Sequence, residues 1–467
     1  MHNPNLSSSD HAGPPWLTVP EDLGFLDPVL WPQGTVRDLS GQILIGGQTV
    51  NALLEQYGSA LYVMDEEDFR TRAHQFTTDF PGWTVHYAGK SFLCRSVARW
   101  IMEEGLGLDV CSGNELAVAL SVGFPPERIG VHGNNKSIEE LISAIEAGVG
   151  SIIVDSFDEI AKIETLAAQR ECIVRVLVRV TTGVEAHTHE YIATSLEDGK
   201  FGFSVTTGQA LEALMVCENS PHIHLGGIHS HIGSQIFDTE GFRVAARRTM
   251  ALAAQFNSAS HMIEEINLGG GFGIAYTIQD TPMSPAELNR GLVQAIDEAR
   301  SQYNLAPVKL SIEPGRAICG PACVALYTVG TIKKVDIGDG KTRTYVAVDG
   351  GMSDNIRTAL YQAEYSAVLA NRSSDAEPML SRVVGKHCES GDILVHDVYL
   401  PSDLRIGDII AVPASGAYTR SMASNYNYAL RPAMVAVNSK GSRLILRRET
   451  LEDLLALDVG EDDKTLG

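Results

Sequence analysis

The chain has 467 residues, 58 of them acidic and 36 basic, which gives a formal net charge of −22. At roughly 150 residues per domain this length suggests about three domains, although one barrel can take ~250 residues. The acidic balance argues against binding to nucleic acid or to an anionic membrane, because both need a basic surface. Hydrophobic residues at 44% and charged residues at 20% exclude a disordered or fibrous chain.

Cysteine usage and the start of the chain indicate where the protein works. Its seven cysteines are an odd number scattered through apolar segments, which fits reduced thiols better than a disulfide framework. Residues 1–15 are rich in Asn, Ser and Pro and lack the basic start and apolar run of a signal peptide. No apolar stretch approaches the ~20 residues of a membrane helix. We expect a cytoplasmic protein with no membrane contact.

The middle of the chain alternates short apolar runs with longer segments of helical spacing. Segments such as Ile138–Ala147 and Pro285–Gln302 repeat apolar residues at i, i+3 and i+4. Because parallel strands need crossover helices, eight such alternations predict a (β/α)₈ TIM barrel, with a doubly wound sheet as the alternative. The runs expected to form its strands are Thr84–Tyr87, Gly107–Val110, Ile129–His132, Ile152–Asp155, Ile173–Val180, Leu225–His231, Glu265–Leu268 and Lys309–Ile312.

After Leu326 the alternation stops. Tyr327–Val335 and Thr342–Val348 flank a glycine-containing turn and predict a hairpin. Later β-like runs lack strong helical crossovers between most of them, which predicts a mostly antiparallel C-terminal β domain. Ile43–Ile45 could add a strand to it, and the barrel would then be inserted between two β segments.

These patterns give the expected domain boundaries. They are a flexible N-terminal arm at residues 1–32, a segment joining the β domain at 33–64, the barrel at 65–325 and the β domain at 326–467.

Polar residues recur where the predicted barrel strands end. They are Lys90, Asp109, His132, His231 and Glu313. In a parallel barrel all of these positions face one mouth, the C-terminal face that carries the chemistry of barrel enzymes. Together they predict a site at that face.

Lys90 directly follows the first strand, in the run Tyr87-Ala-Gly-Lys90. A lysine desolvated inside a barrel mouth favours its neutral, nucleophilic form, which suits Schiff-base chemistry. The alternative is a solvated loop lysine.

The glycine run Gly269-Gly-Gly-Phe-Gly273 follows the seventh strand. Without a Cβ, glycines let backbone N–H groups converge on a phosphate, and barrel phosphate sites commonly use the loops after strands seven and eight. The run lacks the Rossmann spacing and the Walker lysine, and its alternative is a tight structural turn. Glu313-Pro-Gly-Arg316 pairs an acid with a cation, which suits either a surface salt bridge or a carboxylate that holds a ring nitrogen protonated.

Three His-x-His pairs raise the question of a metal site. They begin at His187, His222 and His229, and alternate residues of a strand share a face, as in zinc barrel hydrolases. These pairs come late in the chain, and no downstream His and Asp set completes a tetrahedral site. Cys319 and Cys323 also lack a second ligand pair. We therefore predict no metal.

An ordered set of motifs resembles one enzyme family. The motifs are Tyr87-Ala-Gly-Lys90, His231-Ile-Gly-Ser234, Gly269-Gly-Gly-Phe-Gly273, Glu313-Pro-Gly-Arg316, Cys388-Glu-Ser-Gly-Asp392 and Gly416-Ala-Tyr418. They are similar to those of the fold-type III pyridoxal-phosphate (PLP) decarboxylases, which join a barrel to a β domain. The likeness runs from about Gly41 to Val437, nearly the whole chain.

The resemblance implies the cofactor PLP and a role for each motif. Lys90 would form a Schiff base with the cofactor, Glu313 would pair with its ring nitrogen, and Cys388 would return a proton after CO₂ leaves. The alternative for Cys388 is an inert buried thiol. The other residues implied to bind the cofactor are Asp109 (which would orient Lys90), His231 (stacked on the ring), Ser234, Gly271, Gly273, Gly315, Arg316 and Tyr418.

Other positions bear on the substrate. Arg316 and Arg357 could clamp two carboxylates, and Glu389 with Tyr361 would meet the distal amino-acid end, with Tyr418 nearby. This favours decarboxylation of meso-2,6-diaminopimelate to L-lysine and CO₂, the last step of lysine biosynthesis. The alternative is a decarboxylase of ornithine, arginine or carboxynorspermidine.

The resemblance also implies an assembly. Family members are homodimers with shared active sites, and Cys388 and Glu389 would then reach Lys90 of the second copy. The segment from Glu185 to Gly202 resembles the mobile loop that covers the site. Two further readings stay open, a catalytically silent regulator of a decarboxylase and a zinc barrel hydrolase.

Overall fold

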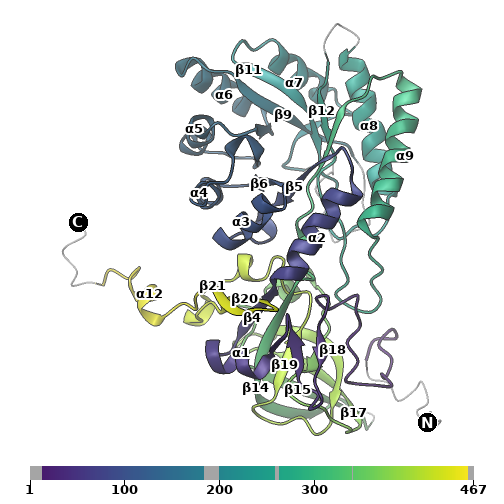
Figure 1. Ribbon diagram of the computed structural model, residues 1–467, viewed down its shortest axis with the longest axis vertical. Helices are drawn as coiled ribbons and strands as arrows, with labels where there is room; N and C mark the ends of the chain where they lie inside the picture. Colours follow the sequence, from purple (N-terminus) through teal and green to yellow (C-terminus); the bar gives the residue numbers. More distant parts are fainter. Residues whose placement is uncertain (1–12, 184–198, 258–261, 339, 461–467) are drawn as a thin grey trace. The chain divides into compact units, whose positions relative to one another are not determined.

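The structure is a computed structural model that describes residues 13–183, 199–257, 262–338 and 340–460 (Figure 1). The chain divides into two compact units. The barrel unit comprises Arg70–Ile274 and Thr281–Ile318. The β unit comprises Met1–Phe69, Ala275–Asp280 and Cys319–Gly467.

The barrel unit is built on eight parallel strands that close on themselves. The last strand pairs with the first, with Ser311 opposite Thr84 and Ile312 opposite Val85. All eight strands expected from the sequence are present, and the predicted (β/α)₈ barrel is confirmed. The strands are β5 (Thr84–Ala88), β6 (Gly107–Val110), β7 (Ile129–Val131), β8 (Ser151–Val154), β9 (Val174–Thr181), β11 (Ile223–Ser230), β12 (Glu265–Asn267) and β13 (Lys309–Ile312). A short strand, β10 (Phe203–Ser204), pairs with β9.

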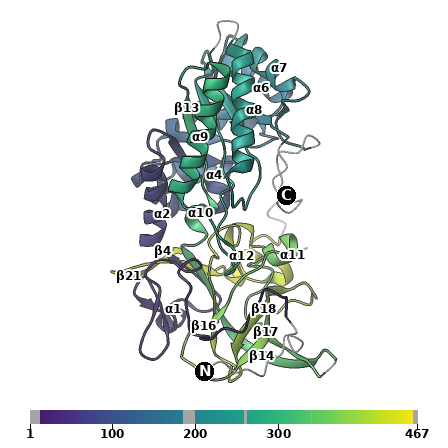
Figure 2. The same ribbon diagram turned by 90° about the vertical axis from the view of Figure 1, so that its right-hand side faces the viewer.

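Helices surround these strands, and helices that are neighbours in the sequence pack side by side (Figure 2). Two of the longer ones begin at capping boxes, Ser137 with Glu140 and Ser284 with Glu287, where side chains satisfy the first free N–H groups. The helices are α2 (Glu66–Asp79), α3 (Arg95–Glu103), α4 (Gly113–Leu120), α5 (Ile138–Ala147), α6 (Phe157–Gln169), α7 (Gln209–Glu218), α8 (Glu240–Asn257), α9 (Pro285–Tyr303) and α10 (Arg316–Cys319).

The β unit contains a mostly antiparallel sheet of nine strands, as predicted. The expected hairpin is formed by β14 and β15, which pair from Asp336 opposite Thr342 to Val329 opposite Val348. The strands are β4 (Leu61–Asp65), β14 (Cys323–Asp336), β15 (Thr342–Val348), β16 (Val368–Leu369), β17 (Pro378–Val384), β18 (Ile393–Pro401), β19 (Ile409–Val412), β20 (Ala433–Asn438) and β21 (Gly441–Leu446). Helices α1 (Val50–Tyr57), α11 (Arg357–Tyr361) and α12 (Leu451–Leu455) complete the unit.

The strand predicted near the start of the β unit is present, in a second and smaller sheet. Ile43–Ile45 forms β2, which lies in a separate three-stranded sheet with β1 (Val36–Arg37) and β3 (Gln48–Thr49). The N-terminal strand of the large sheet is β4, which pairs with β14 on one side and β20 on the other. All five residues of β4 are buried, and the four before Asp65 form an apolar run without the alternation that marks a half-exposed strand.

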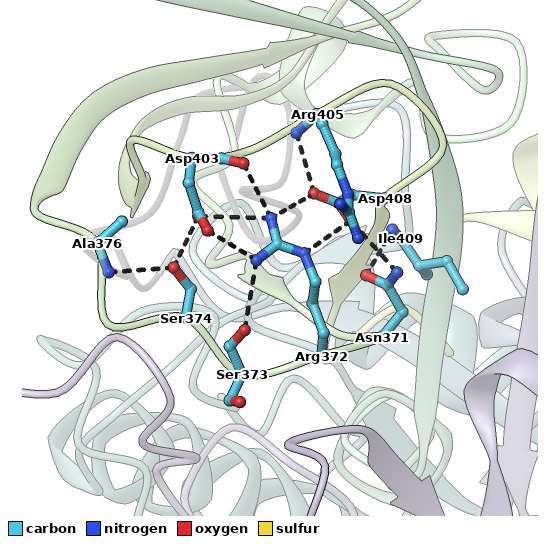
Figure 3. A network of polar contacts seen from close by, with 9 residues as sticks. All are labelled: Asn371, Arg372, Ser373, Ser374, Ala376, Asp403, Arg405, Asp408 and Ile409. Atoms are coloured by element: carbon cyan, nitrogen blue, oxygen red, sulfur yellow. Dashed lines mark hydrogen bonds and ion pairs between the residues drawn. The ribbon is translucent and has the colours of Figure 1, made fainter.

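A buried aspartate organises the loops beside β19 (Figure 3). Arg372 donates to both carboxylate oxygens of Asp408, at 3.0 and 2.8 Å, and also to Asp403 at 2.9 Å. Asn371 and the backbone N–H of Arg405 donate to Asp408 as well. Burial by itself would raise the pKa of Asp408, but the hydrogen bonds from Arg372 outweigh it and lower the pKa. Asp408 is therefore a buried carboxylate anion held by one guanidinium.

We expect Arg372→Ala to destabilise the protein by about 2 kcal/mol, because it leaves the Asp408 carboxylate buried without its cation. The free energy of unfolding in urea measures the effect. Arg405→Ala is the matched control: its side chain approaches the same carboxylate at 3.8 Å but is 73% exposed, so a loss below about 0.5 kcal/mol is expected. Because the Asp408 pKa is lowered, the difference should be complete above the ordinary aspartate range and shrink as the pH falls through the lowered pKa. Equal losses in both variants would contradict this role.

Within the described ranges, no helix is both long enough and apolar enough to cross a membrane.

Candidate functional site

The barrel unit places most of the predicted site residues at the C-terminal ends of its strands. Lys90 lies in a 3₁₀ turn, η1 (Gly89–Ser91), directly after β5, and Asp109 lies in β6. His231 follows β11, and Glu313 follows β13. Because all eight strands are parallel, these ends meet at one mouth of the barrel. Lys90 is exposed in the chain, since its turn lies beyond the end of the strand.

Glu313 is the centre of a buried polar cluster. Its Oε1 accepts a hydrogen bond from Asn267 Nδ2 at 2.8 Å and lies 3.0 Å from His229 Nε2 and 3.4 Å from His132 Nε2. Burial by itself would raise the pKa of Glu313, but the charges of His229 and His132 and the hydrogen bond from His229 outweigh it. The pKa lies well below the ordinary glutamate range, so Glu313 is an anion. Its Oε2 takes part in none of these contacts.

His231 is a neutral imidazole. Burial, with the positive charges of Lys90 and Arg179, holds its pKa well below the ordinary histidine value. Its Nδ1 accepts the N–H of Gly270 at 3.2 Å, which fixes the orientation of the ring. A neutral, fixed ring can stack on a flat ligand without adding charge to the site.

The glycine run after β12 passes close to two other loops. Gly269 and Gly271 have φ of 70° and 108°, a region that disfavours residues with a Cβ. A Cβ on Gly270 would collide with the carbonyl oxygen of Glu313, and one on Gly271 with that of Gly233. Only glycine fits here, so the backbone itself forms this part of the mouth.

A cation and a hydroxyl accompany the glycine run. Arg316 is buried and donates from Nη2 to Ser234 Oγ at 2.9 Å. A Cβ on Gly315 would lie 2.9 Å from the Ala88 carbonyl oxygen, so this glycine lets the loop after β13 pass the end of β5. Backbone N–H groups, a hydroxyl and a guanidinium are the donors that a phosphate requires. The residues present therefore fit PLP, with an anionic carboxylate available for a protonated ring nitrogen.

Asp109 contacts histidines. Its Oδ1 lies 3.3 Å from His86 Nδ1 and 3.4 Å from His132 Nε2. Its Oδ2 is buried and has no hydrogen-bond partner among the residues that the structure describes. The predicted orientation of Lys90 by Asp109 stays a prediction.

The sequence analysis assigned no role to Asn267, His229 or His86. Asn267 ends β12 and is buried, and its Oδ1 also accepts the N–H of Gly269. The sequence held a usable signal for Asn267, because it is a polar residue at the end of its strand, much as Asp109 lies near the end of β6. His229 was seen only as part of a His-x-His pair.

The His-x-His pairs divide into different environments. His222 lies 2.8 Å from Glu164 and His224 lies 2.9 Å from Glu264, both near the surface. His229 instead joins His132 and Glu313, whose ligand atoms all lie within 4.8 Å of one another and could hold a metal ion. Bound-metal analysis is therefore the direct test of the zinc-hydrolase alternative. The pair that begins at His187 lies outside the described residues.

Most of the loop expected to cover the site also lies outside the described residues. Its last part, Lys200–Gly202, is anchored to the barrel. The ring of Phe201 lies 4.3 Å from the guanidinium of Arg179, and its carbonyl accepts from Thr181 Oγ1 at 2.6 Å.

In the β unit, Arg357 begins α11 and is 4% exposed. Its guanidinium lies 4.4 Å from the ring of Tyr276, and Nη1 donates to Tyr365 Oη at 2.5 Å. Its Nε is buried and has no hydrogen-bond partner in the described part of the chain. The two tyrosines therefore fix the guanidinium while a donor is left for a ligand. Tyr361, at the end of the same helix, is half-buried.

Cys388 and Glu389 lie in an exposed loop of the β unit. The loop is shaped by Asp392, whose carboxylate accepts the N–H groups of His387 at 2.7 Å and Met352 at 2.6 Å. Glu389 accepts a hydrogen bond from Tyr426 Oη. The loop thus holds a thiol and a carboxylate side by side.

Two further residues of the β unit, His387 and Tyr418, have features that bear on the predicted site. The ring of His387 bonds at both nitrogens, to Asn427 at 2.9 Å and to Ser353 at 2.8 Å, which ties the loop to two others. Tyr418 has a φ of 57°, unusual for a residue with a Cβ. Such strained positions cluster at functional sites.

The barrel, the anionic Glu313 and the glycine run define a class of enzyme. A family profile described as "Pyridoxal-dependent decarboxylase, pyridoxal binding domain" matches residues 66–320. Diaminopimelate decarboxylase of Mycobacterium tuberculosis is 51% identical over 444 residues, 94% of this chain and 99% of the relative. That of Bacillus subtilis is 46% identical over 432 residues, 91% and 97% of the two chains.

A solved structure gives the same result. The diaminopimelate decarboxylase from M. jannaschii in complex with L-lysine matches with a TM-score of 0.86 and 31% identity, over 92% of this chain and 99% of that one. The chain therefore belongs to the diaminopimelate decarboxylases, within the pyridoxal-dependent decarboxylases. The resemblance found in the sequence is confirmed.

Proposed function

We propose that the protein decarboxylates meso-2,6-diaminopimelate to L-lysine and CO₂, with PLP held in the barrel mouth. The observation that carries the proposal is the buried Glu313 anion beside a glycine run and the Ser234–Arg316 pair, in a chain 51% identical to a diaminopimelate decarboxylase. When bound, PLP supplies a protonated pyridine that accepts the electrons left as CO₂ departs.

The barrel residues have separate tasks in this proposal. Lys90 would carry the cofactor covalently, and Glu313 would keep the proton on its ring nitrogen, because a carboxylate of low pKa does not take that proton. His231 covers one face of the ring as a neutral imidazole. Ser234, Gly271, Gly273, Gly315 and Arg316 of this unit would hold the phosphate, together with Tyr418 of the β unit.

The β-unit residues meet the substrate and its product. Arg357 would bind one carboxylate and Arg316 of the barrel unit the other, while Glu389 and Tyr361 would receive the distal amino group. Cys388 Sγ supplies the proton that replaces CO₂ on the α-carbon. The exposed loop that carries Cys388 and Glu389 supports delivery of both groups together.

We further propose a homodimer in which Cys388 and Glu389 of one copy complete the site around Lys90 of the other. Exposure of Lys90, Cys388 and Glu389 in the single chain supports this arrangement. The cytoplasm is the proposed location, since all seven cysteines are free thiols.

The direct test is CO₂ release from a panel of amino acids with and without added PLP. We expect turnover of meso-diaminopimelate with PLP and little turnover of ornithine or arginine, because two buried guanidinium groups, Arg316 and Arg357, are proposed to bind two carboxylates. Arg357→Lys should reduce kcat/KM for diaminopimelate by about tenfold or more, since an ammonium group cannot bind a carboxylate in bidentate fashion. Preference for ornithine, or unchanged kinetics in this variant, would favour the alternative decarboxylase.

A further inference from the structure

Three hydrogen bonds close a ring between the end of β12 and the residue that follows β13. Asn267 Nδ2 donates to Glu313 Oε1 at 2.8 Å, and Asn267 Oδ1 accepts the N–H of Gly269 at 2.8 Å. The carbonyl oxygen of Gly269 in turn accepts the backbone N–H of Glu313 at 2.9 Å. Each of the three residues is therefore bonded to the other two.

The backbone partner fixes which way the Asn267 amide points. The N–H of Gly269 can only donate, so the amide oxygen faces it and the amide nitrogen must face Glu313. An amide nitrogen is a donor at every pH, whereas the imidazoles of His132 and His229, near the same carboxylate oxygen, can gain or lose protons. Asn267 thus presents a permanent donor to Glu313, which favours the charged form of this carboxylate.

The bond between Asn267 and Gly269 is an Asx turn, in which an Asn side chain accepts the N–H two residues further along the chain. Gly269 is the first residue of the glycine run and has a φ of 70°. A Cβ on Gly269 would lie 2.5 Å from the carbonyl oxygen of Ser230, so the turn packs closely against the end of β11. The same amide that holds Glu313 therefore also fixes the start of the glycine run.

Asn267 is a polar residue in a strand of a barrel whose interior is usually filled by Val, Ile and Leu. It is 3% exposed. Burial of an amide costs free energy unless its polar atoms are hydrogen-bonded, and here both the oxygen and the nitrogen have a partner. The partners, rather than the packing, explain the presence of an amide at this position.

We propose that Asn267 is a positioning residue that fixes both ends of the cofactor site. Its amide nitrogen orients Glu313 toward the ring nitrogen, and its amide oxygen sets the start of the loop that receives the phosphate. The proposal rests on the proposed function, in which Glu313 meets the ring nitrogen of PLP and the glycine run meets its phosphate. Asn267 acts through Glu313 and Gly269, which it holds at a set distance from each other.

Two variants of Asn267 separate its two hydrogen bonds. Asn267→Leu removes both bonds and keeps the approximate size of the side chain. Asn267→Ser keeps an oxygen that can accept the N–H of Gly269, but its shorter side chain no longer reaches Glu313. Ser311→Ala is the matched control, because Ser311 is buried, pairs with Asn267 across the strands and donates its hydroxyl hydrogen to Glu265 at 2.6 Å.

The first readout is the affinity of the cofactor-free protein for two compounds, measured by equilibrium dialysis. They are PLP and its analogue with a C–H group in place of the ring nitrogen. The wild type should prefer PLP, because only PLP can pair its ring nitrogen with the Glu313 carboxylate. This preference should fall about tenfold in both Asn267 variants, the equivalent of one hydrogen bond to a charged group. Ser311→Ala should keep the wild-type preference.

The analogue alone reports on the phosphate end of the site. Asn267→Leu should weaken its binding by about threefold, because the Asx turn at the start of the glycine run is lost. Asn267→Ser should bind the analogue as the wild type does, since the serine oxygen keeps the turn.

Activity gives a further readout. In Asn267→Ser, kcat for meso-diaminopimelate should fall about tenfold while KM changes by less than about twofold, because other residues are proposed to bind the substrate. A structural role alone would lower the melting temperature, as in Ser311→Ala, without separating kcat from KM.

An unchanged preference for PLP over the analogue in Asn267→Ser would overturn the proposal, and so would a wild type that lacks this preference. Should the leucine variant not fold, the serine variant decides by the same criterion. If the wild type releases no CO₂ from diaminopimelate, the proposed function fails. The two affinities are measured without substrate, so they still decide the role of Asn267.

Discussion

Lys90→Ala is expected to reduce decarboxylation by about four orders of magnitude, because it removes the amine proposed to carry the cofactor covalently. Lys136, which follows β7, is held by Glu159 and by the carbonyl groups of Gly133 and Ile153. The visible absorbance of the cofactor bound to lysine should be lost at the same time. Because Lys90 is exposed and lies in a turn, its truncation leaves no cavity and no buried partner unpaired. CO₂ release and the absorbance spectrum measure the two effects, and thermal unfolding should be unchanged.

Lys162→Ala, an exposed lysine of α6, is the control and should keep full activity. A mixture of Lys90→Ala and Cys388→Ala protomers tests the shared site. If Cys388 acts on the second copy, random pairing restores about a quarter of wild-type activity, since half of the dimers contain one intact site. No recovery on mixing would contradict the shared site, and full activity of Lys90→Ala alone would contradict the assignment of Lys90.

Glu313→Gln is expected to lower kcat by about 10²- to 10³-fold, because an amide carries no charge to keep the ring nitrogen protonated. The amide nitrogen would also face the N–H donors of His229 and Asn267, which now converge on a carboxylate oxygen. Glu313→Asp retains the charge and should lose less activity than Glu313→Gln. The variants are compared by kcat across pH and by the cofactor spectrum.

In the glutamine variant the cofactor should still attach to Lys90 but lose its ring proton at lower pH than in the wild type. Equal spectra and equal pH profiles in wild type and Glu313→Gln would contradict the role of this carboxylate. If the substitutions destabilise the fold, both variants should have a lower melting temperature. This measurement separates a structural effect from a chemical one.

Strand positions could be predicted from the sequence because barrel strands are buried on both sides and read as short apolar runs. The same reasoning did not find β4, whose four apolar residues are followed by Asp65 and then directly by a helix. The strand that was predicted there, Ile43–Ile45, has two fully buried side chains and forms part of the smaller sheet of the same unit. The sequence predicted this strand but not its pairing partners, because pairing depends on residues distant in the sequence.

The candidate site was predictable where residues end strands, as for Glu313 and His231. The contacts of Asp109 with His86 and His132 were not predicted, because they require knowing which residues of each strand point into the barrel. Alternate residues of a strand lie on the same face, so one inward-facing residue identifies the others on its strand. His86 lies two residues before Ala88, and Gly107 lies two residues before Asp109. The fixing of Arg357 by Tyr276 and Tyr365 could not be foreseen, as these residues come from three separate segments.

The position of β4 has a consequence for synthesis of the chain. This strand pairs with β14, which follows the entire barrel, and with β20, near the C-terminus. On the ribosome the edge that pairs with β14 stays open until the barrel strands have emerged, and the edge that pairs with β20 stays open until almost the whole polypeptide has emerged. The nascent protein therefore passes through a stage with a finished barrel and an apolar, unpaired strand, a species that chaperones recognise and that aggregates if translation stops early.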